Sequence, residues 1–254
     1  MPRYALALEY DGTAFVGWQR QAVGLSVQQV LEEAASHLVH GAPVASITAG
    51  RTDAGVHAAG QVASIDLDRD ITPDKLRDAL NFHMLPHAVA VLRAARAAEG
   101  WNPRFSAIGR AYRYVILNRR ARPALEAGQV WHVHLPLDVA AMHAAAQSLL
   151  GHHDFTSFRA TSCQAKSPLR TLDRLDVRRE GERIVIEAAA RSFLHHQVRN
   201  MVGTLKLVGQ GLWPVARVAE ALAARHRAAA GPTAPPEGLA LMAVRYPEDP
   251  FGPT

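Results

Sequence analysis

The chain of 254 residues has a single cysteine, Cys163. One thiol excludes an internal disulfide, and no CxxC pair is present that could hold zinc or an iron–sulfur cluster. No apolar run approaches the ~18 residues that a membrane-spanning helix needs. Charged residues make up only 20% of the chain against 48% apolar residues, which excludes disorder over most of its length. These absences predict a globular cytoplasmic protein that is not attached to a membrane.

Basic residues, in contrast, are present in excess over acidic ones. The 28 basic and 23 acidic residues give a net charge of +5 and a pI near 9.8. Arg far outnumbers Lys, and the guanidinium group is the better bidentate partner for phosphate. A basic chain of this kind can bind nucleic acid, but an Arg-rich composition also arises without that function, so charge alone identifies no partner.

Residues 1–104 predict a first lobe with the element order β-α-β-β-α-β, which is the ferredoxin-like arrangement. Residues 4–10 alternate like a strand, and further strand-like segments lie at 44–49, 60–66 and 89–92. Ser26 with Gln29 forms a capping box that opens a helix running to about Val39. Thr72-Pro73 begins a second helix, with Pro at the first helical position.

Residues 105–246 predict a second lobe of similar alternation. Strands are expected at 112–117, 131–135, 170–179, 183–190 and 239–246, and helices at 138–150, 195–208 and 215–226. The predicted fold class is therefore α+β, with two ferredoxin-like lobes whose mainly antiparallel sheets join around a central basic cleft. Residues 247–254 are expected to form a loose tail.

The run Gly50-Arg51-Thr52-Asp53-Ala54-Gly55-Val56-His57 is the first candidate site. Two glycines bracket a polar segment directly after a strand, which predicts a tight turn that presents Asp53 outward. The alternative interpretation is an ordinary Asp-Ala-Gly turn with no chemistry, because Asp and Gly are common turn formers.

The second candidate is the segment from Phe193 to Gly203, read as part of a helix. There His195 and Arg199 would share one face at i, i+4, which favours a basic, phosphate-facing stripe. No carboxylate completes a metal set and HExxH is absent, so we expect no metal. In the third candidate, Arg110 to Tyr114, a strand places Tyr112 and Tyr114 on one face and Arg113 on the other. Such alternation suits base stacking with phosphate contact, and equally a half-buried sheet.

Taken together, these segments resemble the tRNA pseudouridine synthase A family. The resemblance covers about residues 4–246, in the family's order, and the Arg51–His57 run is its most specific part. At Asn81–Ala88 the sequence departs from the Leu-Pro-Asp-Asp-Ile pattern that is more frequent in the family, and it lacks the acidic residues of that pattern. The matching segments are Tyr10–Thr13, Gly17–Gln21, Gly50–His57, Tyr112–Tyr114, Gly151–Phe158, Phe193–Gly203 and Glu237–Leu239.

The resemblance implies isomerisation of uridine to pseudouridine at positions 38, 39 and 40 of the tRNA anticodon stem-loop. The C1′–N1 bond breaks, the uracil rotates, and a C1′–C5 bond forms. Nothing is oxidised, reduced or transferred, so neither a cofactor nor a metal is expected. One carboxylate suffices, by attack on C1′ or C6 or by taking the 2′ proton, and the sequence leaves these three routes open.

By motif match, the resemblance makes Asp53 the catalytic carboxylate and Arg199 its ion-pair partner. Tyr112 would stack on the extruded uracil, and Leu239 would form an apolar wall against it. Arg51 would act where the flipped base leaves the stem or hold its phosphate. The resemblance also implies a homodimer with the tRNA anticodon arm lying across both subunits.

Two other function classes are alternatives to an isomerase. A non-catalytic RNA-binding or chaperone protein on the same fold would use the basic surface alone, but it has no chemical need for Asp53 within its full motif. A metal-dependent hydrolase could use the 13 histidines, but it needs clustered carboxylates that the sequence does not provide.

Overall fold

The computed structural model describes residues 1–252, and the chain divides into two compact units. The first unit comprises Met1–Gly109 together with the chain from Ala240 onward, and the second comprises Arg110–Leu239. We expected lobes of 1–104 and 105–246. The structure instead groups 105–109 and the last strand with the first unit.

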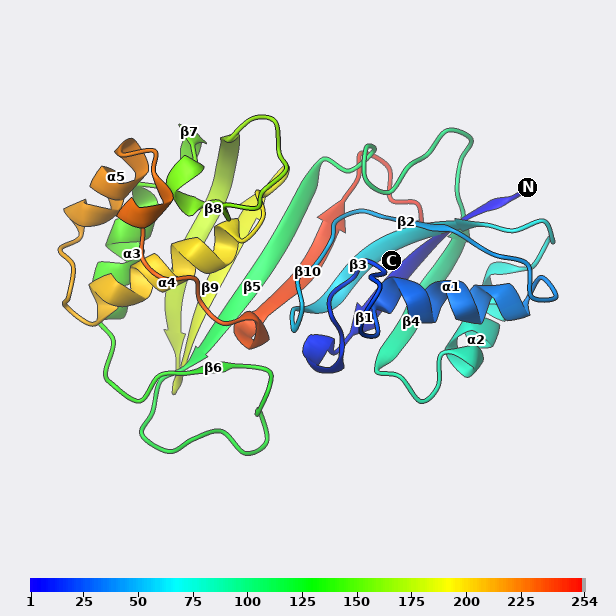
Figure 1. Ribbon diagram of the computed structural model, residues 1–254, viewed down its shortest axis with the longest axis horizontal. Helices are drawn as coiled ribbons and strands as arrows, with labels where there is room; N and C mark the ends of the chain where they lie inside the picture. Colours follow the sequence, from blue (N-terminus) through cyan, green and yellow to red (C-terminus); the bar gives the residue numbers. More distant parts are fainter. Residues whose placement is uncertain (253–254) are drawn as a thin grey trace. The chain divides into compact units, whose positions relative to one another are not determined.

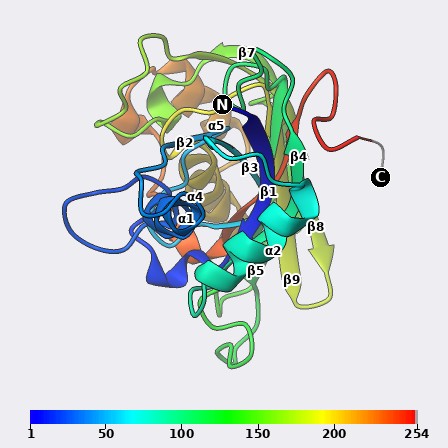
Figure 2. The same ribbon diagram turned by 90° about the vertical axis from the view of Figure 1, so that its right-hand side faces the viewer.

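The first unit has the predicted β-α-β-β-α-β order. Strands β1, β3 and β4 form an antiparallel sheet in the order β4-β1-β3, and β2 pairs antiparallel with β3. Helices α1 and α2 cover one face of this sheet (Figures 1 and 2). The elements are β1 Arg3–Tyr10, α1 Val27–His37, β2 Ser46–Thr48, β3 His57–Asp66, α2 Pro73–His83 and β4 Val89–Arg96.

The helix starts follow the sequence signals. The Ser26 hydroxyl accepts a hydrogen bond from Gln29 N at 3.2 Å, so the N-terminus of α1 is capped as expected. Pro73 is the first residue of α2, where its missing N–H costs nothing. The alternation of β1 directs Tyr4, Leu6 and Leu8 into the core, where all three are fully buried.

Strand β10, Leu239–Arg245, runs parallel to β3, with Ala240 opposite His57 and Leu241 opposite Ala58. This long-range pairing is the reason why the domain boundary differs from the predicted one. The tail is also less loose than expected, because Arg93 Nη2 donates to Phe251 O at 2.6 Å and its guanidinium lies 5.2 Å from the Phe251 ring. Residues 253 and 254 lie outside the described residues.

The second unit contains an antiparallel sheet in the order β5-β9-β8-β7, with the short β6 parallel to β5. Helix α3 packs on β8 and on α4 (Figure 1). Within residues 1–252 no helix is both long enough and apolar enough to cross a membrane. The elements are β5 Gly109–Leu117, β6 Trp131–His132, α3 Val139–Gln147, β7 Gly151–Asp154, β8 Leu169–Glu180, β9 Arg183–Ala190, α4 Gln197–Gly209 and α5 Ala216–Ala223.

Two details of the second unit correct the prediction. Helix α4 begins at Gln197 rather than His195, because His196 adopts a left-handed backbone conformation with φ 62°. His195 therefore precedes the helix, and its predicted i, i+4 relation to Arg199 is wrong. The helix that Asp138 opens ends at Gln147, and Gly151, with φ 95°, begins a strand that the sequence did not predict.

Candidate functional site

The loop of residues 49–56 connects β2 to β3 and carries Asp53. Val56 N donates to Asp53 O at 3.1 Å, and Gly55 has φ 76°, so the predicted tight turn is present. Arg51 is exposed, Thr52 is buried and Asp53 is half-buried. The turn brings Asp53 to the edge of the core, where its side chain is partly shielded from water, next to an arginine that solvent reaches.

Gly12 and Gly17 pack closely against the backbone of this loop. A Cβ on Gly12 would lie 2.2 Å from Val56 O, and one on Gly17 would lie 2.6 Å from Thr52 O. Gly17 also has φ 107°, a backbone conformation that L side chains rarely adopt. Trp18 N donates to Thr52 O at 3.0 Å, so the segment 12–18 packs backbone to backbone against the loop. The family-like segments 10–13 and 17–21 therefore build the support of the Asp53 loop.

A buried polar network lies under the same loop. The Tyr10 and Thr52 hydroxyls are 2.7 Å apart, and Gln61 Nε2 donates to Gly50 O at 2.8 Å and to Tyr10 Oη at 3.3 Å. The three side chains are 5%, 7% and 0% exposed, respectively. Burial raises the pKa of Tyr10 to about 12, so its hydroxyl stays protonated at neutral pH. This network is not evident from the sequence alone, although a glutamine inside the strand β3 is a signal of a buried polar group.

His57, at the start of β3, contacts the segment that supports the loop. Gly12 N donates to His57 Nδ1 at 3.0 Å, so that ring nitrogen is the acceptor in this contact. Asp11 Oδ1 lies 3.2 Å from the same nitrogen and accepts hydrogen bonds from Thr13 N and Thr13 Oγ1. The two contacts of Nδ1 exclude one another, because a nitrogen that accepts from Gly12 has no proton to give to Asp11.

In the second unit, β5 places its side chains on alternate faces as predicted. Tyr112 is half-buried, and its ring meets Phe193 edge-on with centroids 5.2 Å apart. Tyr114 is fully buried and donates to Pro235 O at 2.7 Å. Arg113 points to the other face, where Arg113, Arg174 and Arg178 surround Glu187 with N–O distances of 2.8–3.3 Å. Hydrogen bonds from Arg178 and Arg113 lower the pKa of Glu187.

Arg199 lies in the first turn of α4 and holds the Pro/Gly-rich segment 226–236, which we call the strap. Arg199 Nε donates to Ala234 O at 2.8 Å, and Ala234 N donates to Arg199 O at 3.1 Å. The fully buried Asn200 accepts hydrogen bonds from Arg227 Nη2 and Thr233 Oγ1. A Cβ on Gly203 would lie 1.8 Å from Pro232 O, so the strap lies flat on the helix. What the sequence shows as a loop is therefore an anchored segment.

The strap leads to Leu239, the first residue of β10, whose side chain is 6% exposed. A Cβ on the preceding Gly238 would lie 2.6 Å from the Tyr114 ring. Arg51 and Asp53 thus belong to the first unit, and Tyr112, Arg199 and Leu239 belong to the second.

The segments 151–158 and 81–88 both form hydrogen bonds with other parts of the chain. In the segment 151–158, Phe155 and Phe158 are fully buried, and Ser157 Oγ accepts a hydrogen bond from His226 N at 2.9 Å, at the start of the strap. In the segment 81–88, whose sequence differs from the family's pattern, the Asn81 side chain accepts from Val91 N at 2.7 Å and donates to Val91 O at 2.9 Å. Both segments hold neighbouring elements in place.

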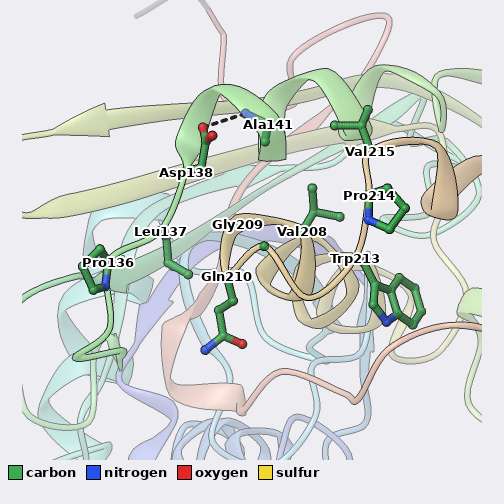
Figure 3. Close-up of a pocket in the computed structure, with 11 residues that line it drawn as sticks. Pro136, Leu137, Asp138, Ala141, Val208, Gly209, Gln210, Trp213, Pro214 and Val215 are labelled. Atoms are coloured by element: carbon green, nitrogen blue, oxygen red, sulfur yellow. Dashed lines mark hydrogen bonds between the residues drawn. The ribbon is translucent and has the colours of Figure 1, made fainter.

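The second unit also has an open hollow of about 780 Å³ between the start of α3 and the end of α4 (Figure 3). Its lining comes from residues 136–141 and 208–215, and Asp138 on its rim accepts a hydrogen bond from Ala141 N at 2.9 Å. The predicted site residues do not line it. The candidate site is therefore the Asp53 loop and the residues that the motifs add to it.

Comparisons with a family sequence model and with individual proteins both match this chain to one family. The sequence model of the tRNA pseudouridine synthase family matches residues 6–106 and 145–247. A protein from Acidiphilium cryptum named tRNA pseudouridine synthase A is 73% identical, with 99% of each chain covered. Proteins of the same name from Rhodospirillum centenum and Gluconobacter oxydans are 63% and 58% identical, covering 97% and 98% of this chain and 100% and 91% of their own.

Proposed function

The chain belongs to the tRNA pseudouridine synthase family, and we propose that it isomerises uridines 38, 39 and 40 of the tRNA anticodon stem-loop to pseudouridine. The observation that carries this proposal is the position of Asp53 on a loop whose backbone is fixed by Gly12 and Gly17. A carboxylate held in this way is a preorganised nucleophile or base, and a protein that only binds RNA has no use for it.

The reaction needs a carboxylate and a way to move the base. The C1′–N1 glycosidic bond breaks, N1 takes up a proton, a C1′–C5 bond forms, and the proton on C5 leaves to solvent. Asp53 either attacks C1′, attacks C6, or removes the 2′ proton. Because the target base is stacked inside the stem, it must be extruded before any of these steps.

We assign the remaining steps to the other motif residues. Arg51, exposed on the Asp53 loop, would hold the phosphate of the extruded nucleotide or occupy the gap that the base leaves. Tyr112 would stack on the uracil, and Leu239 would contact it as an apolar wall. Arg199 would keep Asp53 ionised and oriented during the reaction. Its Nε already donates to the strap at Ala234 O, so this pairing would use the terminal nitrogens.

The partner is tRNA, and we propose that the enzyme works as a homodimer in which the anticodon arm contacts both subunits. We place it in the cytoplasm, where its tRNA substrate is processed. The net charge of +5 favours a polyanionic substrate.

The test uses unmodified tRNA transcripts and the Asp53→Asn variant. The wild-type protein should form pseudouridine at positions 38–40 without an added cofactor. The Asn variant should fold and bind tRNA but form none, because an amide is neither a nucleophile nor a base here. Asp78→Asn, an exposed carboxylate on α2, is the matched control and should keep full activity. Wild-type protein that binds tRNA but leaves every uridine unchanged would favour the non-catalytic alternative.

A further inference from the structure

The network under the Asp53 loop consists of three side chains from three different parts of the first unit. Tyr10 ends β1, Thr52 precedes Asp53 in the loop, and Gln61 lies within β3. Gln61 is completely buried. A buried polar cluster of this kind costs free energy unless every group is bonded, so its geometry is tightly determined.

The hydrogen bonds of Gln61 have a fixed direction, because its amide nitrogen only donates and its amide oxygen only accepts. The two Nε2 protons of Gln61 go to Gly50 O and Tyr10 Oη, and its Oε1 accepts from Val62 N at 3.1 Å. The Tyr10 hydroxyl accepts from Gln61 and shares a hydrogen bond with Thr52 Oγ1, in which either oxygen can be the donor. Burial keeps the Tyr10 phenol protonated near neutral pH, so its hydroxyl can act as donor or acceptor in this bond.

The network thus holds the part of the loop that leads into Asp53 at two points. Gln61 holds the carbonyl of Gly50, three residues before Asp53, and Tyr10 holds the side chain of Thr52, its immediate neighbour. The glycine contacts constrain the loop backbone from the segment 12–18, whereas this network constrains it from β1 and β3.

We propose that Tyr10 and Gln61 are positioning residues that set the location of the Asp53 carboxylate through Thr52 and Gly50. This inference rests on the proposed role of Asp53 in catalysis. Both residues are buried, so we expect them to affect the chemical step and to leave tRNA binding unchanged. The expected signature is a lower kcat at constant KM, since a shift of about 1 Å in a reacting group costs on the order of 100-fold in rate.

Tyr10→Phe is the sharpest single change because it removes one oxygen and keeps the ring. We expect kcat for tritium release from C5-labelled tRNA to fall about 10- to 100-fold, with KM within twofold of wild type. Thr52→Val, which removes the hydroxyl at equal volume, should match it, and Thr52→Ser, which keeps the hydroxyl, should recover most of the rate. The double variant Tyr10→Phe/Thr52→Val should lose little more than Tyr10→Phe alone, because the Tyr10–Thr52 hydrogen bond is already absent in the single variant.

The matched control lies in the same strand. Like Tyr10, Tyr4 is buried, and its hydroxyl donates to Ile71 O and accepts from Ile71 N, both at 2.9 Å, away from the Asp53 loop. Tyr4→Phe should therefore lower the melting temperature about as much as Tyr10→Phe while leaving kcat at the wild-type value. The comparison is made at a temperature where circular dichroism shows both variants folded.

The outcomes separate this inference from the proposed function. If Asp53→Asn is inactive while Tyr10→Phe and Thr52→Val keep kcat within twofold of Tyr4→Phe, the positioning role is wrong and the proposed function stands. If Tyr10→Phe and Thr52→Val both fail to fold while Tyr4→Phe folds, the network serves folding alone, and the positioning role is equally overturned. If Asp53→Asn is active, the proposed function itself fails.

Discussion

Gly17→Ala should reduce catalysis by moving the Asp53 loop, although Gly17 itself lies 36 residues away from Asp53 in the sequence. The added Cβ would sit 2.6 Å from Thr52 O, 3.0 Å from the Asp53 carbonyl carbon and 3.1 Å from Ala54 N. All three atoms belong to the loop backbone, which cannot rotate away as a flexible side chain could. Restoring an ordinary contact of 3.4 Å requires the loop to shift by about 0.8 Å.

The expected fall in kcat follows from the size of this displacement. A misplacement of about 1 Å costs on the order of 100-fold, so we expect kcat to fall about 10- to 100-fold. The positive φ of Gly17 adds a stability cost of roughly 1–2 kcal/mol for any residue with a Cβ. The two effects are separable, because the first acts on turnover and the second on unfolding.

The assay measures tritium release from C5-labelled tRNA at saturating tRNA concentration, alongside urea denaturation. Gly41→Ala is the matched control, since Gly41 has φ 86° but its added Cβ would meet nothing within 4 Å. Both variants should lose similar stability, and only Gly17→Ala should lose turnover. Equal turnover in the two variants at full folding would refute the view that close packing of Gly17 on the loop positions Asp53.

The elements of the first unit follow from local signals in the sequence. Alternation in residues 4–10, the Ser26 cap and the Pro at the start of α2 all act within a few residues, and the structure confirms each of them. The parallel pairing of β10 with β3 could not be predicted in this way, because it joins Ala240 to His57 across most of the chain. A domain boundary drawn by sequence order therefore placed β10 in the wrong unit.

The second unit shows where backbone conformation overrides pattern. The apolar periodicity from 195 to 208 predicts a helix that begins at His195. His196 takes up a left-handed conformation instead, and the helix begins at Gln197. Nothing in the side chain of histidine requires this conformation. The strap was equally hidden, because its Pro/Gly-rich composition is typical of a loose loop, whereas buried Asn200 fastens it to α4.

For the site, the sequence led to Asp53, the proposed catalytic residue, and missed the residues that support its loop. Asp53 stands out because its motif is specific, whereas Gly12 and Gly17 gain their meaning only when the segment 12–18 is seen packed on the loop. Tyr10 and Gln61 were hidden for a similar reason, since each reads as part of a strand. Support of a loop is a property of three-dimensional contacts, so a linear pattern reveals it poorly.

The remaining predictions concern the second unit. Arg199→Ala should lower kcat more than tRNA affinity, and Arg199→Lys, which keeps the charge, should recover part of kcat; equal loss of binding and turnover in the Ala variant would contradict the proposed pairing with Asp53. The second concerns Glu187, whose pKa is lowered mainly by the hydrogen bond from Arg178. Because its pKa is lower in the folded than in the unfolded state, the carboxylate stabilises the fold above the unfolded-state value of about 4.3, and this stabilisation is lost as the pH falls through the folded-state value. Glu187→Gln should therefore reduce the free energy of unfolding at pH 7 by about 1 kcal/mol, a figure discounted because the surrounding arginines are half exposed. The difference from wild type should shrink in urea titrations as the pH is lowered from 7 to below 4, whereas Glu220→Gln, which breaks a single exposed pair with a nearby arginine, should have little effect at either pH. A Glu187→Gln deficit that stays constant across this range would show that the carboxylate contributes through shape and packing and that its charge plays no part.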